Sequence, residues 1–281
     1  MKKLEHLFGG LNMNWKRLLV FALLAGAYTG LINQVPALAG TSFRDIAVSY
    51  EVWVFFAVVI AVSCRKPLEA TAKAFVFFLI SQAVGFLVEV PALGWSQAYA
   101  YFRMWFVQIL LTFPGGYAAY YCKKDNWPGA LLCLAGAVFE AVFLTGYAAA
   151  CRMAFPKHLL TVLFCLFMIF CFAFVLVKKK GFRILVLAGA AVTVCLYSVQ
   201  MSRSESSISQ QLPTGCDSYA LQINDGSRVE IDAASGTFTY YYNPARAQDN
   251  VLTFTGKDGS TMVYQVIKDG SMVRLEAQES K

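Results

Sequence analysis

The chain has 281 residues, of which 58% are hydrophobic and only 15% are charged, and its formal net charge is +7. An average soluble domain has about 25% charged residues, so this composition excludes an ordinary soluble globular protein. The Lys and Arg residues are scattered over short segments between apolar runs, a distribution that argues against nucleic acid as a partner.

Before residue 200 the chain contains several apolar runs of the length that a helix needs to cross a bilayer, about 17–25 residues. We therefore predict that residues 1–200 form a membrane all-α bundle of about seven transmembrane helices, with the lipid bilayer as its surroundings. The predicted spans lie near 18–32, 46–63, 71–90, 103–121, 128–150, 158–177 and 182–199.

The first span follows a basic N-terminal segment, as the apolar part of a signal peptide does. The triplet Ala37-Leu38-Ala39 is a fair match to a cleavage site, so removal of this span is one alternative. Gly26 and Gly30, however, lie four residues apart and would let another helix approach closely. We therefore interpret the first span as a retained, packed helix.

The fourth span contains a proline inside its apolar run. Pro114 is followed by Gly115 and Gly116, and a proline removes one hydrogen bond of a helix and clashes with the preceding turn. We expect a kink in this helix, or alternatively a break that lines a cavity.

The Lys and Arg residues alternate in number between successive loops, which predicts the orientation in the membrane. Thirteen lie in the N-terminal segment and in every second loop: Lys2, Lys3, Lys16, Arg17, Arg65, Lys66, Lys73, Lys123, Lys124, Lys178, Lys179, Lys180 and Arg183. The alternate loops hold only four: Arg44, Arg103, Arg152 and Lys157. We predict a plasma-membrane protein with its N-terminus in the cytoplasm and its C-terminal part outside.

After the last span the sequence changes its period. Residues 201–212 are rich in Ser and Gln and predict a flexible tether. From 213 to 281 apolar residues alternate with polar ones, and Gly follows Asp225, Ser235, Asp258 and Asp269. Such dipeptides between alternating runs are typical of hairpins. We predict a small extracytoplasmic domain, an antiparallel β-meander or barrel of five or six strands.

Five polar residues within or beside the spans are candidates for ligand binding. Glu140 lies near the middle of the fifth span, where a carboxylate is costly to insert. Gln82 and Glu89 share a face of the third span, Gln108 lies in the fourth, and Arg103 lies at its outer mouth. Two interpretations stay open: hydrogen bonds and ion pairs that hold helices together, or a polar pocket in which Glu140 binds a cation, a proton or a cationic group.

No catalytic signature is present, so we do not expect an enzyme. The chain has two histidines, His6 and His158, too few for a histidine-rich metal site. It contains no GxSxG, Walker A or GxGxxG motif. We expect no cofactor and no metal, and we interpret His158 as an interfacial polar anchor.

Two functions are consistent with these features. The favoured one is binding or translocation of a small solute through a polar pocket that opens outward and deepens toward Glu140. The alternative is a non-transporting membrane sensor or scaffold whose external β domain binds a partner or an envelope component. The tyrosines Tyr240, Tyr241, Tyr242 and Tyr264 fit such an interface, although cross-strand packing explains them equally well.

Overall fold

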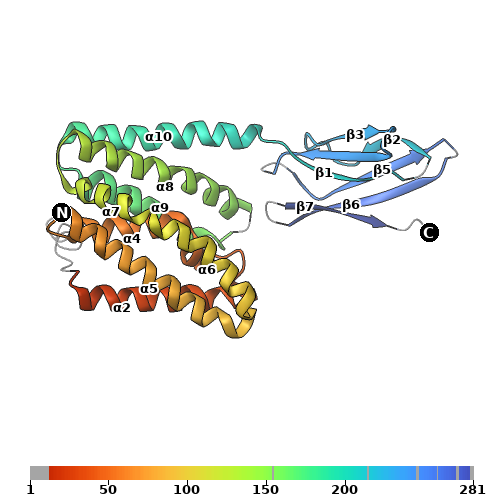
Figure 1. Ribbon diagram of the computed structural model, residues 1–281. Coiled ribbons are helices and arrows are strands. Elements are labelled where there is room, and N and C mark those ends of the chain that lie inside the picture. The colour runs from red at the N-terminus through yellow and green to blue at the C-terminus, as the bar shows by residue number, and fades with distance from the viewer. Residues whose placement is uncertain are drawn as a thin grey trace. The chain divides into compact units, whose positions relative to one another are not determined.

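The computed structural model describes residues 13–153, 155–213, 215–244, 247–257, 259–269 and 272–278. These residues form two compact units (Figure 1). The helical unit comprises the described residues up to 151 together with 155–194, and the β unit comprises the described residues of 152–154 and 195–281. The predicted order, helices followed by an antiparallel β domain, is confirmed.

Nine α-helices are found among the described residues. They are α2 (Trp15–Asn33), α3 (Ser42–Val48), α4 (Tyr50–Ser63), α5 (Pro67–Leu93), α6 (Trp95–Leu110), α7 (Thr112–Tyr120), α8 (Trp127–Met153), α9 (Leu159–Phe170) and α10 (Lys180–Arg203). The 3₁₀ turns η1 (Pro36–Leu38) and η2 (Tyr121–Lys123) lie between helices, and η3 (Cys171–Leu176) continues α9 as a π-helix.

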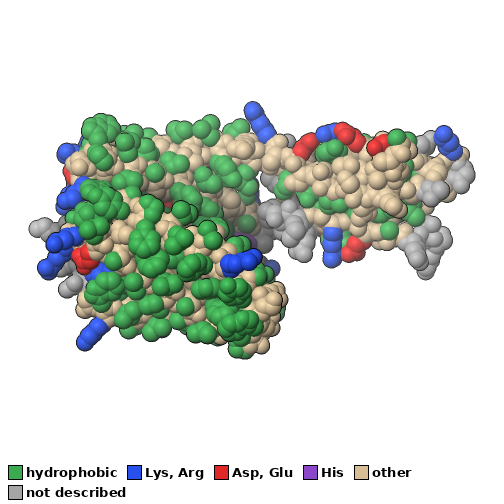
Figure 2. Space-filling view, in the orientation of Figure 1, with side chains coloured by type: hydrophobic (Ala, Val, Ile, Leu, Met, Phe, Trp, Pro, Cys, Tyr) green, Lys and Arg blue, Asp and Glu red, His purple; other side chains and the backbone are tan. Residues whose placement is uncertain are grey.

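Five of these segments are long and apolar enough to cross a membrane. They are Trp15–Asn33, Pro67–Leu93, Trp127–Arg152, Leu159–Leu176 and Lys180–Met201. Many of the exposed side chains on them are themselves apolar, for example Leu24 and Leu87. Figure 2 shows hydrophobic side chains over much of the visible face of the helical unit. The helices are therefore compatible with a membrane protein.

Two of the seven predicted spans are interrupted. The second is divided into α3 and α4, which are bent by 56° at the extended residue Ser49. The fourth is divided at Leu111 into α6, with 16 residues, and α7, with 9. Pro114 explains this second break, because it has no N–H to donate to the carbonyl four residues earlier, at the end of α6.

Several glycines let elements of the helical unit pack closely against one another. A Cβ atom on Gly26 would lie 2.3 Å from the carbonyl oxygen of Ser81, and one on Gly30 would lie 2.8 Å from the side chain of Val88. The predicted packing face of the first span is thus present, and it lies against α5. In the same way Gly136 of α8 lies against the ring of Phe172 in η3.

The β unit contains seven strands among its described residues. They are β1 (Ser206–Gln211), β2 (Cys216–Leu221), β3 (Arg228–Asp232), β4 (Thr237–Tyr242), β5 (Asn250–Gly256), β6 (Thr261–Asp269) and β7 (Met272–Gln278). They form two antiparallel sheets with the orders β1-β4-β3 and β2-β5-β6-β7. The prediction of one meander or barrel with five or six strands was wrong, since β1 and β2 each pair with a strand distant in sequence.

The two sheets share a single hydrophobic core. Phe238 of β4 packs on Phe254 of β5, with ring centroids 4.6 Å apart, and on Tyr264 of β6, with centroids 5.5 Å apart. Tyr240 and Tyr242 are buried in the same core. These three predicted interface candidates, Tyr240, Tyr242 and Tyr264, are therefore core residues, and the packing explanation holds for them.

The segment 201–212 is not a free tether. The helix α10 continues to Arg203, and only Ser204 and Glu205 separate it from β1. The strand β1 pairs with β4 along its whole length, from Ser206 opposite Tyr242 to Gln211 opposite Thr237. Its sequence, SSISQQ, has one apolar residue, so its alternation becomes visible only through this pairing.

Candidate functional site

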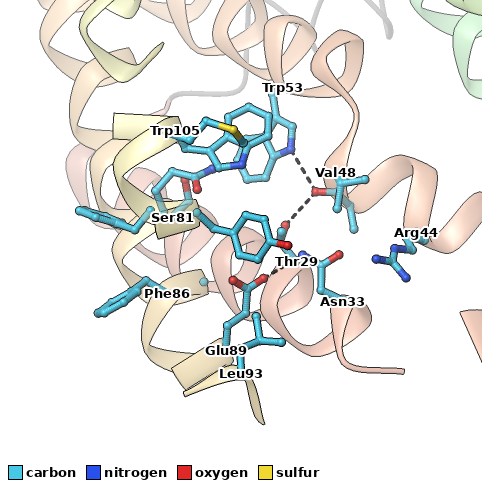
Figure 3. Close-up of a pocket in the computed structure, with 16 residues that line it drawn as sticks. Thr29, Asn33, Arg44, Val48, Trp53, Ser81, Phe86, Glu89, Leu93 and Trp105 are labelled. Atoms are coloured by element: carbon cyan, nitrogen blue, oxygen red, sulfur yellow. Dashed lines mark hydrogen bonds between the residues drawn. The ribbon is translucent and has the colours of Figure 1, made fainter. Parts of the chain in front are cut away.

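A cavity of about 330 Å³ lies in the helical unit among α2, α3, α4, α5 and α6 (Figure 3). Aromatic rings from three helices form much of its wall: Trp53, Phe86, Tyr101, Phe102 and Trp105. Its polar lining includes one acidic residue, Glu89 of α5, and one basic residue, Arg44 of α3. A mostly apolar cleft of this size with a few polar groups is typical of a small-molecule site.

Hydrogen bonds from neighbouring helices hold the polar wall in place (Figure 3). Asn33 of α2 donates its side-chain N–H to Oε1 of Glu89, at 2.8 Å. The carbonyl oxygen of Ala47, in the last turn of α3, accepts from the Thr29 hydroxyl at 3.0 Å and from the Trp53 indole N–H at 3.1 Å. The lining is therefore built from side chains whose positions are set by contacts between four helices, α2, α3, α4 and α5.

A second cavity, of about 250 Å³, lies among α4, α5, α6 and α7. It shares Trp53, Gln82 and Trp105 with the first cavity, and its lining is otherwise mainly apolar. Gln108 lies in this second cavity, where its side-chain N–H donates to the Tyr50 hydroxyl at 3.1 Å. This cavity suits an apolar group better than a charged one.

The five predicted site residues do not form one site. Gln82 lines both cavities, Glu89 the first and Gln108 the second. Arg103 is exposed on α6 and lines neither cavity. Glu140 also lines neither, and it is completely buried on α8. The structure therefore brings together Gln82 and Glu89, with Gln108 in the adjoining cavity, and places Glu140 elsewhere.

Glu140 has a neighbour that was not among the five candidates predicted from the sequence. The carboxylate of Glu51, on α4, acts on it electrostatically, and Glu51 is also completely buried. The hydroxyl groups of Ser49 and Tyr147 lie beside Glu51. The sequence does show Glu51 as an acidic residue directly before the apolar run VWVFFAVVIAVS. It does not show that the Glu51 side chain faces the interior, because that depends on how α4 packs.

A hydrogen-bonded group lies next to this carboxylate pair. The Nδ1 atom of His158 is 2.7 Å from Oδ2 of Asp45, and the Thr161 hydroxyl donates to the same oxygen at 3.0 Å. The His158 ring stacks on Tyr147, with centroids 6.3 Å apart. The interpretation of His158 as a simple interfacial anchor was incomplete, because its ring is held by α3 and α8.

Comparisons with protein-family models, with curated proteins and with solved structures find no match to this chain. In chemical terms, the first cavity can hold a small charged molecule against aromatic rings, whereas Glu51 and Glu140 line neither of the two cavities.

Proposed function

We propose that this is an integral plasma-membrane protein that binds a small solute bearing an ammonium group in the first cavity, as a step in moving that solute across the bilayer. The observation that carries the proposal is the placement of the Glu89 carboxylate inside a cavity walled by aromatic rings. Asn33 holds one carboxylate oxygen, which leaves Oε2 to accept from the solute.

Aromatic rings and a carboxylate together favour a cation. The faces of Trp and Tyr rings attract an ammonium group by about 0.5–2 kcal/mol, depending on how far it is desolvated. A hydrogen bond between charged groups contributes a further 1.5–3 kcal/mol or so. Arg44 lines the same cavity, so a solute that also carries a carboxylate finds a partner of opposite charge.

The charge pattern supports an outward opening. Asn33 and Glu89 lie near the C-terminal ends of α2 and α5, on the side whose loops hold few Lys and Arg residues. Cytoplasmic loops carry the excess of Lys and Arg. We therefore place this end of the bundle, and the β unit that follows α10, outside the cytoplasm.

Ligand-dependent thermal stability of the purified full-length protein tests this function. Choline, a neutral amino acid and acetate serve as probes, and we expect the first two to raise the melting temperature and acetate to leave it unchanged. Glu89→Gln should weaken binding of choline about 10- to 100-fold, since it removes the negative charge that attracts the ammonium group.

Two variants sharpen the test. Glu276→Gln makes the same change at an exposed position of β7 and should leave binding intact. Arg44→Gln should weaken binding of the amino acid more than that of choline. Stabilisation by none of the ammonium probes, or equal affinity of the wild type and Glu89→Gln, would show that the cavity is not an ammonium site.

A further inference from the structure

Within the described part of the helical unit, five buried side-chain oxygens make no hydrogen bond of normal geometry. They belong to Ser49, Glu51 and Glu140, and include both oxygens of each carboxylate. Neither glutamate forms a salt bridge with a described Lys or Arg. Almost all buried polar groups in native proteins have a partner, so these five oxygens require an explanation.

In the described part of the chain, no positively charged side chain is found to act directly on Glu51 or Glu140. The titratable groups that face the pair are Asp45 from α3, Tyr147 from α8, and Cys165 from α9, all acidic or neutral. The basic side chain of His158 lies nearby, and its ring is bound to Asp45. Two neighbouring carboxylates in an apolar interior cannot both remain ionised, because each charge is costly to bury and the two repel each other.

A bound proton explains these observations better than a bound metal ion. No described group of three or more His, Cys, Asp and Glu side chains could hold a metal. Neither of the two cavities is lined by Glu51 or Glu140, so neither offers space for a hydrated ion at the pair. A proton requires no such space and lowers the charge of the pair from −2 to −1.

A chain of protonatable groups leads from the pair toward the exposed segment 155–157. Tyr147 lies beside Glu51 and stacks on His158 with an interplanar angle of 27°. The side chain of His158 is 14% exposed and that of Asp45 is 15% exposed. An imidazole ring can both accept and release a proton, which makes His158 the natural point of exchange with water.

We propose that Glu51 and Glu140 form a proton-binding carboxylate pair that exchanges its proton with water through Tyr147 and His158. The proton enters from water at His158, ends on a carboxylate oxygen of the pair and leaves by the same route, so atoms and charge balance. Buried Asp, Glu and His chains of this kind are typical of proton relays in membrane proteins. This inference does not rest on the solute cavity.

Infrared spectroscopy of the full-length protein in detergent tests the bound proton. At neutral pH exposed carboxylates are ionised, so the carbonyl stretch of a protonated carboxylic acid reports a buried one. We expect this band in the wild type, with a shift to lower frequency in D₂O. We expect it in the Glu276→Gln control, and we expect its loss in the double variant Glu51→Gln/Glu140→Gln.

The wild-type spectrum alone can overturn the proposal, whether or not the double variant folds. If the folded wild type shows no such band, both carboxylates are ionised and the pair holds no proton. A melting temperature that rises with sodium chloride but not with potassium chloride at the same ionic strength, together with absence of the band, would assign the pair to a sodium ion instead.

The proposed proton route through Tyr147 and His158 needs a separate test. The measurement is the rate at which the carbonyl band of the protonated carboxylic acid shifts after transfer to D₂O. The variant His158→Gln removes the group that exchanges with water, and we expect the shift to become about 100-fold slower, as for loss of a positioned acid–base group. Thr161→Val removes the other hydrogen bond to Asp45 without removing a titratable group, and it should leave the rate unchanged. Equal rates in wild type and His158→Gln would exclude His158 from the route.

Discussion

At Gly26 the absence of a side chain sets the distance between α2 and α5. The nearest atoms to a Cβ placed there are backbone atoms of Ser81, with its carbonyl oxygen at 2.3 Å. Backbone cannot rotate away as the end of a flexible side chain can, so a larger residue must push the two helices apart. Leu18 and Phe77, on the same two helices, are completely buried and would lose contacts with this movement.

We predict that Gly26→Ala lowers the free energy of unfolding by about 1–3 kcal/mol, the usual cost of overpacking a tight contact. Equilibrium unfolding of the full-length protein in detergent measures this loss. Gly146→Ala is the matched control, because its Cβ would meet nothing within 4 Å, and alanine should stabilise α8 by up to about 1 kcal/mol. Similar effects at the two positions would contradict close packing of α2 on α5.

The bent junction between α3 and α4, at Ser49, lies next to both the first cavity and the buried carboxylates. Val48 and Trp53, on either side of it, line the first cavity, whereas Ser49 and Glu51 belong to the set of buried oxygens without partners. Irregular backbone within a helical bundle is tolerated where neighbouring groups satisfy it. Here the carbonyl of Ala47 accepts two side-chain hydrogen bonds, from Thr29 and Trp53.

Removal of one of these hydrogen bonds should destabilise the junction between α3 and α4. We predict that Thr29→Val lowers the free energy of unfolding by about 1 kcal/mol and also weakens solute binding at the first cavity, which Thr29 lines. Thr193→Val is the control: its hydroxyl donates to Gly189 of its own helix at 2.8 Å, away from the cavity. Equal solute affinity in the two variants would show that this junction does not position the cavity wall.

At the scale of the whole molecule, the distribution of Lys and Arg predicts on which side each unit lies. Figure 2 shows Lys and Arg side chains gathered at the end of the helical unit where α8 and α10 begin. Helix α8 begins shortly after Lys123 and Lys124, and helix α10 begins at Lys180. Such an excess is typical of the cytoplasmic end of a membrane protein.

We predict that alkaline phosphatase fused after Lys281 is active in bacterial cells, since this enzyme folds only outside the cytoplasm. The same enzyme fused after Lys124, in the loop before α8, should be inactive. A fluorescent protein that folds only in the cytoplasm should give the opposite pattern. Activity of phosphatase at Lys124 but not at Lys281 would reverse the proposed orientation.

The sequence by itself determined the features that depend on local composition. Apolar runs predicted α2, α5, α8, the α9–η3 segment and α10, and the Asp-Gly and Ser-Gly dipeptides predicted the change to β structure after the last helix. Gly26 and Gly30 also revealed a packing face, because their spacing alone places them on one side of a helix. Each of these signals is contained within a window of some 20 residues.

Only the tertiary structure decided which polar residues meet. Glu140 interacts with Glu51, distant in sequence and on a different helix, while Gln82 and Glu89 line a cavity elsewhere. The order of the strands in the β unit was likewise unpredictable, since the polar strand β1 is defined by pairing with β4. The physical reason is the same in both cases: the partner of a side chain depends on how whole elements pack, and packing joins residues that no local pattern connects.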